Sequence, residues 1–196
     1  GVGRTGCSLS NCAITSSPGV INSDFDSPNY FDRIVIGVLG GNVWRFDIDD
    51  PVPANWQRLQ LASLSVNPLA EPKRKFFFPP TIAPQNGTGF PFHGVYIGSG
   101  DKEHPILTRL TTPATTDDLM FMLMDDPSLT SGGGTPNASG PSAMSLPITP
   151  ASLLDASTGT VTAAALVGQQ GWFLPLQNGE KVINAPVVFI GKNNVS

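Results

Sequence analysis

The sequence predicts an all-β fold of many short strands, and three observations lead to that prediction. An apolar run that ends in Ile-Gly occurs three times, at Ile36-Gly37, Ile97-Gly98 and Ile190-Gly191. The 196 residues include 21 glycines and 19 prolines, which favours turns between short elements. No apolar periodicity of 3.6 residues extends beyond about two turns, so no longer helix is expected. Repeated short strands with a glycine at the same place are typical of an array of small sheets, of which a β-propeller is a common closed form.

The first predicted sheet begins with the run 33–39, which is apolar on both faces. Residues 40–42 (Gly-Gly-Asn) suit a tight hairpin turn, because Gly and Asn tolerate positive φ. The returning strand, 43–48, alternates, and an alternating strand over 56–61 follows it. Three large side chains of 43–48 share one face and are expected to be buried: Trp44, Phe46 and Ile48.

The second half of the chain continues the pattern. Residues 76–83 and 94–98 are expected to be the outer and inner strands of a second blade, and 106–110 is a further strand. The run 119–124 carries no charge and is expected to be the most buried segment. Residues 127–147 are mostly Pro, Gly, Ser, Thr and Asn, which predicts a long insertion too poor in apolar residues to offset its ordering entropy. Blades of ~40–50 residues would give about four blades over the chain.

Composition limits the classes of partner. Charged residues make up only 13% of the chain and the net charge is −4, which disfavours binding to nucleic acid. No apolar run approaches the ~20 residues that a membrane-spanning helix needs. Cys7 and Cys12 either form a local disulfide in an exported protein or are two free thiols. The first residue is not Met and the last strand has no successor, so residues 1–196 are expected to form a single partial domain, a piece of a longer chain.

Acidic residues suggest one metal site. Asp24, Asp26 and Asp32 occupy positions 1, 3 and 9 of a calcium-loop frame, and hard carboxylate oxygens suit Ca²⁺. Position 5 is Pro28 and position 12 is Val35, so two of the usual ligands are missing. The alternative is a turn of the Asx type at the strand entry.

Other polar residues give weaker signals. Asp47, Asp49 and Asp50 are interpreted as a solvated turn at a strand end, with a role as metal ligands as the alternative. The two histidines, His93 and His104, are isolated in the sequence, which argues against zinc. We find no Gly-x-Ser-x-Gly, phosphate-loop or dinucleotide motif, and no catalytic residue is expected.

Three stretches together resemble one family, the PilY family of type IV pilus biogenesis and tip-adhesin proteins, in its C-terminal propeller domain. Residues 30–47 (YFDRIVIG leading into GGNVWRFD) are similar to its strand–turn–strand segment, and 95–100 (VYIGSG) to a second segment. Residues 171–189 (GWFLPL, GEKV, APVVF) are similar to a third. The resemblance implies a modified β-propeller on an exported bacterial protein, in the periplasm, on the outer membrane surface or on the extracellular pilus.

The resemblance also implies function. It implies a non-enzymatic role in pilus assembly, retraction control and adhesion, with pilin subunits or minor pilins at the pilus tip and a host or abiotic surface as partners. It implies a calcium loop before Arg33, in which Asp24, Asp26 and Asp32 match three of the acids and Pro28 replaces another, so that any calcium is bound weakly.

Two other functions are compatible with a propeller. One is a quinoprotein-type oxidoreductase, which would show a quinone-like absorption band. The other is a soluble glycan-binding propeller, which needs exposed aromatic side chains on loops, with Trp172 as the main candidate.

Overall fold

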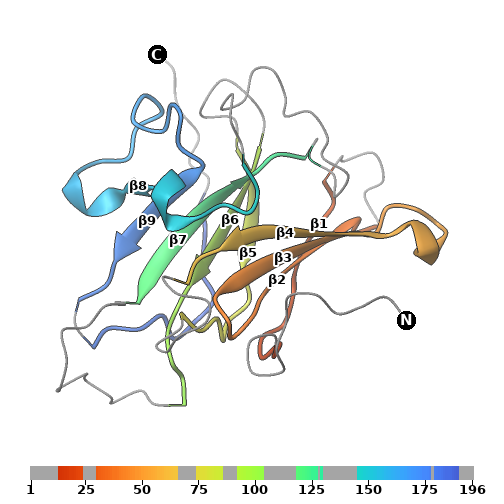
Figure 1. The fold of residues 1–196 in the computed structure, drawn as a ribbon, viewed down its shortest axis with the longest axis horizontal. Helices are drawn as coiled ribbons and strands as arrows, with labels where there is room; N and C mark the ends of the chain where they lie inside the picture. The colour runs from red at the N-terminus through yellow and green to blue at the C-terminus, as the bar shows by residue number, and fades with distance from the viewer. Residues whose placement is uncertain are drawn as a thin grey trace.

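The structure, a computed structural model, describes residues 13–23, 30–65, 74–85, 92–103, 118–127, 129, 145–177 and 179–189. This part of the chain forms two β-sheets, and its only helices are 3₁₀ turns of three residues each, so the predicted all-β fold is confirmed (Figure 1). The turns are η1 (Pro53–Asn55), η2 (Pro150–Ser152) and η3 (Ala156–Thr158). No helix among the described residues is long and apolar enough to cross a membrane.

The first sheet is an antiparallel meander in the order β1-β2-β3-β4. Its strands are β1 (Gly19–Ile21), β2 (Arg33–Gly37), β3 (Asn42–Asp47) and β4 (Gln57–Ser63). The predicted hairpin turn joins β2 to β3: the amide of Gly41 donates to the carbonyl of Val38 at 3.1 Å, and Gly41 has a φ of 80°. That positive φ explains why a glycine stands there.

The second sheet has the order β5-β6-β7-β9-β8, antiparallel except for the parallel pair β8–β9. Its strands are β5 (Thr81–Gln85), β6 (Phe92–Gly98), β7 (Leu119–Asp125), β8 (Leu154–Asp155) and β9 (Gly171–Pro175). The uncharged run predicted to be the most buried is β7, the central strand, and six of its seven residues are buried. A strand with neighbours on both sides and side chains packed on both faces is apolar along nearly its whole length, and the charged residue of β7, Asp125, stands at its end.

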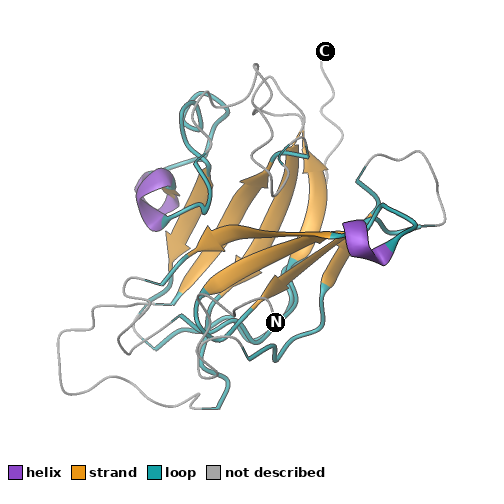
Figure 2. Ribbon diagram, turned by 45° about the vertical axis from the view of Figure 1, so that its right-hand side comes forward, coloured by secondary structure: helices purple, strands orange, loops and turns teal. Residues whose placement is uncertain are grey.

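One core joins the two sheets. Figure 2 shows the first sheet lying across the second. The shared cluster takes Val35, Val43 and Leu61 from the first sheet and Val95, Ile97, Phe121 and Leu123 from the second. The rings of Phe76 and Phe121 meet edge to face with centroids 6.2 Å apart. This core fixes how the two sheets face each other, and it therefore fixes which side chains meet where the apolar part ends.

The predicted inward face of β3 is wrong. Val43 and Arg45 are buried, whereas Trp44 and Phe46 lie on the other face and are half-buried. The register explains the difference, because Arg45 stands opposite the fully buried Val35 of β2 and must share its face. On the outer face, the Arg58 guanidinium lies 5.0 Å from the centre of the Trp44 ring.

Several predictions concern residues outside the described part of the chain: Cys7, Cys12, the strand 106–110, Ile190 and most of 127–147. Within 76–83, only the residues from Thr81 onward are a strand. Phe76 is not in a strand, but it is fully buried in the shared core.

Candidate functional site

Asp32 is the one predicted calcium ligand within the described residues, because Asp24 and Asp26 lie outside them. It directly precedes β2. Its carboxylate accepts hydrogen bonds from the backbone N–H of Ser23, at 2.8 Å and 3.0 Å, and from the Ser23 hydroxyl at 2.8 Å. These bonds tie the residue before β2 to a residue nine positions earlier that follows β1, so they are not an Asx turn. The calcium site stays a prediction, since two of its three acids lie outside the described residues, and within these residues no three His, Cys, Asp or Glu side chains are placed so that they could hold a metal ion.

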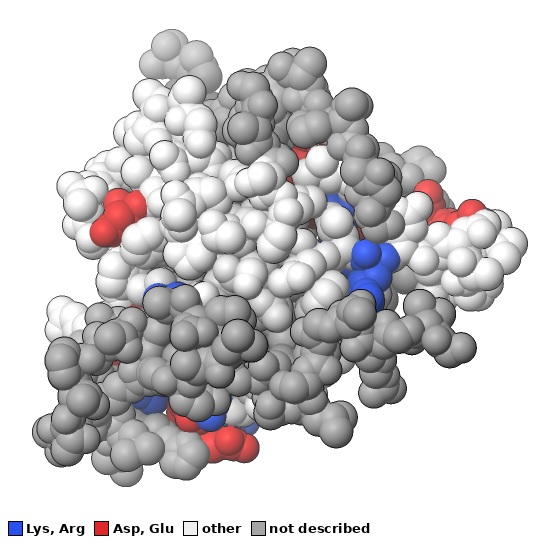
Figure 3. All heavy atoms as spheres, viewed as in Figure 1, with Lys and Arg blue, Asp and Glu red and all other residues white. Residues whose placement is uncertain are grey.

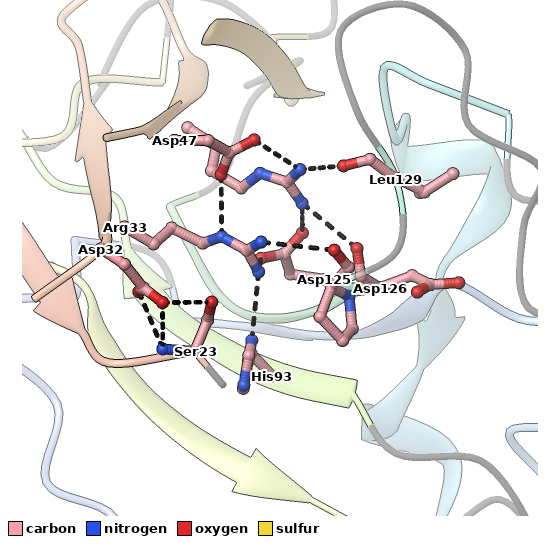
Figure 4. A network of polar contacts seen from close by, with 10 residues as sticks. Ser23, Asp32, Arg33, Asp47, His93, Asp125, Asp126 and Leu129 are labelled. Atoms are coloured by element: carbon pink, nitrogen blue, oxygen red, sulfur yellow. Dashed lines mark hydrogen bonds and ion pairs between the residues drawn. The ribbon is translucent and has the colours of Figure 1, made fainter. Parts of the chain in front are cut away.

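Next to Asp32, a set of buried charges crosses from one sheet to the other (Figure 4). We call Arg33, Arg45, Asp47, His93 and Asp125 the inter-sheet ion network. Antiparallel register places Arg33 opposite Asp47 and Arg45 opposite Val35, so the polar side chains continue the core face of the first sheet. The network therefore forms the polar end of the shared core.

Arg45 lies at the centre of the inter-sheet ion network and is fully buried. Its Nη1 donates to Asp125 at 2.5 Å and its Nη2 to Asp47 at 2.9 Å. It also donates to the backbone carbonyls of Asp126, at 3.2 Å, and Leu129. Desolvation lowers the pKa of Arg45, but the charges and hydrogen bonds of Asp125 and Asp47 more than offset it, and the net pKa is raised. The guanidinium is thus held charged in the interior by carboxylates from both sheets.

Arg33 makes the second bridge. Its Nε donates to Asp47 at 2.9 Å, within its own sheet. Its Nη1 contacts Asp125 at 3.4 Å and His93 Nδ1 at 3.3 Å, and its Nη2 donates to the carbonyl of Pro127 at 3.3 Å, all on the side of the second sheet. Two arginines and two carboxylates balance in charge, which is what permits such groups to be buried.

A polar cleft of about 460 Å³ opens beside the network, between the end of the first sheet and the residues Pro127 and Leu129. Four carboxylates line it: Asp32, Asp47, Asp49 and Asp50. Asp47 is neutralised by the two arginines, so it is not the solvated turn residue that the sequence suggested. Asp50 is such a residue, because it accepts the backbone N–H of Val52 at 2.7 Å and the side-chain amide of Asn55 at 2.9 Å. The bond from Val52, more than that from Asn55, lowers the pKa of Asp50.

Exposed apolar side chains lie at the same end of the first sheet. Tyr30 and Phe31 directly precede Asp32 and are largely exposed, and Trp56, directly before β4, is half exposed. The carbonyl of Asp50 fixes the Trp56 indole by accepting its Nε1–H at 2.8 Å. Such exposed aromatic groups beside a polar cleft are typical of contact surfaces. Trp172, the aromatic residue that the sequence suggested for a glycan site, instead packs edge to face on Tyr96, with ring centroids 6.4 Å apart.

Sequence reasoning missed most of the inter-sheet ion network. Arg45 and Asp125 are 80 residues apart and Arg33 and Asp125 are 92 apart, and nothing in the sequence links them. The one available signal was the strict alternation of Arg33 with Val35 in β2, and of Val43 with Arg45 in β3. A positive side chain in register with core residues on two neighbouring strands indicates a buried partner elsewhere.

Of the comparisons with known proteins, the one with solved structures finds a similar fold. No protein-family model matches the sequence, and no curated protein matches it either. Among solved structures, the chain is similar to the crystal structure of the Pseudomonas aeruginosa PilY1 C-terminal domain, with a TM-score of 0.51 and 19% sequence identity. The match covers 86% of this chain and 41% of that one, so the chain spans less than half of the length of that domain.

The likeness establishes the fold. The two sheets form part of a β-propeller-like domain similar to the PilY1 C-terminal domain, and the predicted fold class is confirmed.

Proposed function

We propose that this chain is part of a non-enzymatic component of a bacterial type IV pilus, an exported protein that acts in pilus assembly and adhesion. The PilY1-like fold supports this proposal most directly. The sequence motifs that resemble the PilY family support it independently, because 30–47, 95–100 and 171–189 supply β2, β3, β6 and β9 of that fold. Its partners would be pilin subunits or minor pilins at the tip, and a host or abiotic surface.

The surface best suited to such contacts is the loop end of the first sheet. It combines the exposed side chains of Tyr30, Phe31 and Trp56 with the polar cleft. An interface core is usually enriched in aromatic side chains with polar groups around it. Figure 3 shows no extended basic area among the described residues on the face that it draws, which agrees with partners other than nucleic acid.

Deletion of the region that encodes residues 1–196 from the chromosomal gene tests the pilus role. We expect several-fold fewer surface pili and weaker surface attachment, at an unchanged cellular level of pilin. The triple variant Tyr30→Ser/Phe31→Ser/Trp56→Ser should reduce attachment or tip assembly while the protein stays folded and exported. Arg58→Ala is the matched control, since Arg58 is exposed on the outer face of β4, and it should behave as wild type. Normal pilus number and attachment in the deletion strain would contradict the proposal.

The same proposal includes a weak calcium site at Asp24, Asp26 and Asp32. Ca²⁺ takes six to eight oxygen ligands, and three carboxylates with Pro28 in place of another leave gaps for water. We expect a dissociation constant of ~10⁻⁴–10⁻³ M, as in extracellular modules. In calorimetry Pro28→Asp should tighten binding and Asp26→Ala should abolish it, whereas Asp49→Asn, which removes a cleft carboxylate outside the loop, should change it little. Equal binding by the wild type and Asp26→Ala would refute the site.

A further inference from the structure

His93 lies on β6 with only 4% of its surface exposed. Its Nδ1 is 3.3 Å from Nη1 of Arg33. A guanidinium has N–H donors and no acceptor, so Nδ1 must accept the hydrogen bond. The single ring proton of the neutral imidazole is therefore on Nε2. This contact can exist only while Nδ1 carries no proton.

The contact matters because Arg33 bridges the two sheets. It is anchored to the first sheet by Asp47 and reaches the second through His93, Asp125 and the carbonyl of Pro127. His93 and Asp125 are direct cross-strand partners on β6 and β7. Figure 4 shows the Arg33 side chain reaching toward both. The ionisation state of the His93 imidazole therefore affects every contact that Arg33 makes with the second sheet.

We propose that His93 is an acid-sensitive latch between the two sheets. Protonation of Nδ1 turns the hydrogen-bond acceptor into a donor and places a second positive charge next to Arg33. Arg33 loses one partner on the second sheet, and repulsion by the charged ring weakens its contacts with Asp125 and Pro127, while Asp125 keeps its bond to Arg45. The carbonyl of Pro127 is then released from Arg33. Because Pro127 and Arg33 both line the polar cleft, acidification changes the wall of the proposed contact surface.

The surroundings of His93 favour the neutral ring. Burial is the largest cause and lowers the pKa of His93. Two carboxylates, Asp125 on β7 and Asp32 before β2, raise the pKa of His93. Two guanidinium groups, Arg33 on β2 and Arg45 on β3, lower it. The cross-strand partner on β5 is Pro84, which is uncharged. The net pKa is below its usual value of about 6.5, so the latch is closed at neutral pH.

Stability as a function of pH tests the latch. Below pH ~6.5 the unfolded chain binds a proton at this position and the folded protein does not, so the unfolding equilibrium constant rises as pH falls. One proton contributes up to about tenfold per pH unit, until the pH reaches the lowered pKa of the folded state. Asn offers an amide oxygen near the position of Nδ1 and cannot titrate, so His93→Asn should lose this component between pH 7.5 and 5. His104→Asn, at the other histidine, is the matched control and should keep the pH dependence of position 93.

If His93→Asn retains the pH dependence of the wild type, the latch is refuted. A second measurement on the wild-type protein does not depend on any variant folding. Nitrogen-15 NMR of the imidazole rings should show His93 with its proton on Nε2 at pH 7.5, and titrating below pH ~6.5. The same titration should move the amide signals of Asp126 and Leu129, beside the released carbonyl. A proton on Nδ1 at pH 7.5, or titration of His93 above pH ~6.5, would overturn the proposal.

Discussion

Arg45 illustrates how much a single side chain can depend on partners distant in sequence. Arginine is rarely fully buried unless it is paired, and here the pairing residues lie on its own strand and on β7. Removal of one member of a buried ion pair leaves an uncompensated charge, which costs more than the pair itself contributes. The fold therefore tolerates the network only as a complete set.

We expect Arg45→Leu to lower the free energy of unfolding by about 3–5 kcal/mol, because Asp125 would remain buried without its strongest partner. Arg58→Leu is the matched control. Its guanidinium lies over the face of Trp44 at the surface, an interaction that contributes about 0.5–1 kcal/mol. Urea denaturation at pH 7 measures both. Equal losses in the two variants would show that the Arg45 contacts do not stabilise the fold.

At this scale the sequence predicted little of the site. It singled out Asp32, which does lie at the edge of the cleft, because clustered acids are visible locally. It assigned Asp47 to solvent and left His93 isolated, because a charged or titratable side chain looks the same in sequence whether it is solvated or paired across a core. Only the tertiary arrangement decides between the two.

The Ile-Gly repeat has a packing role in the strands. A Cβ on Gly37 would lie 2.6 Å from Cδ1 of Ile97 and 2.7 Å from Cβ of Phe76. A Cβ on Gly98 would lie 2.2 Å from Cγ2 of Val182. The first two copies of the repeat therefore contact each other, because the side chain of Ile97 packs against the space left by the missing side chain of Gly37. Absence of a side chain lets the sheets approach.

Gly37→Ala should destabilise the protein by about 1–3 kcal/mol, the usual cost of overpacking a core. Gly159→Ala is the control, because a Cβ there meets nothing within 4 Å, and its effect should stay within about 0.5 kcal/mol. Thermal denaturation of both variants would check this. A Gly37→Ala protein as stable as the control would mean that the sheets can move apart at no cost.

The two aromatic residues Phe121 and Trp44 should also differ. Phe121 on β7 is fully buried, so Phe121→Ala should cost about 3–5 kcal/mol. Trp44 is half-buried on the outer face of β3, so Trp44→Ala should cost clearly less, despite its larger ring. Denaturant midpoints of the two variants provide the comparison. A larger loss of stability in Trp44→Ala than in Phe121→Ala would show that the outer face of β3 is covered.

The positions of the strands were largely predictable, since apolar runs between Gly, Pro and Asn define β2, β3, β4, β6 and β7. The orientation of β3 was not. Trp44, Phe46 and Ile48 suggested that their face of the strand is buried. The strand instead buries Val43 and Arg45, because Arg45 stands opposite the fully buried Val35 of β2 and shares its face. Hydrophobicity decides orientation only where no buried ion pair competes.

For the whole molecule, the shared core predicts joint unfolding of the two sheets. Residues of both sheets belong to one cluster, and the inter-sheet ion network extends it. Native-state hydrogen exchange should therefore give β2–β3 and β6–β7 the same opening free energy, within about 1 kcal/mol. A first sheet that opens several kcal/mol more readily than the second would show two independent units.

The fold class was predictable for the whole molecule, because composition, turn residues and the repeat all indicate short antiparallel strands. The cleft was not. It is formed by the end of the first sheet together with Pro127 and Leu129, which follow β7, and only the packing of the two sheets brings these parts together. Two of its four carboxylates, Asp49 and Asp50, follow β3 in the turn that the sequence predicted, but nothing in the sequence showed that this turn lines a cleft.

The long sequence separation of the inter-sheet contacts has a kinetic consequence. Arg33 and Arg45 can pair with Asp125 only after β7, which lies 80 to 92 residues later in the chain, has packed against the first sheet. Contacts that close such long loops form late, after the hairpins of each sheet, and contribute little to the folding barrier. Interactions absent from the transition state act on the unfolding rate instead. The buried charges would thus slow the escape from the native state more than they speed its formation, which gives the protein persistence as well as equilibrium stability.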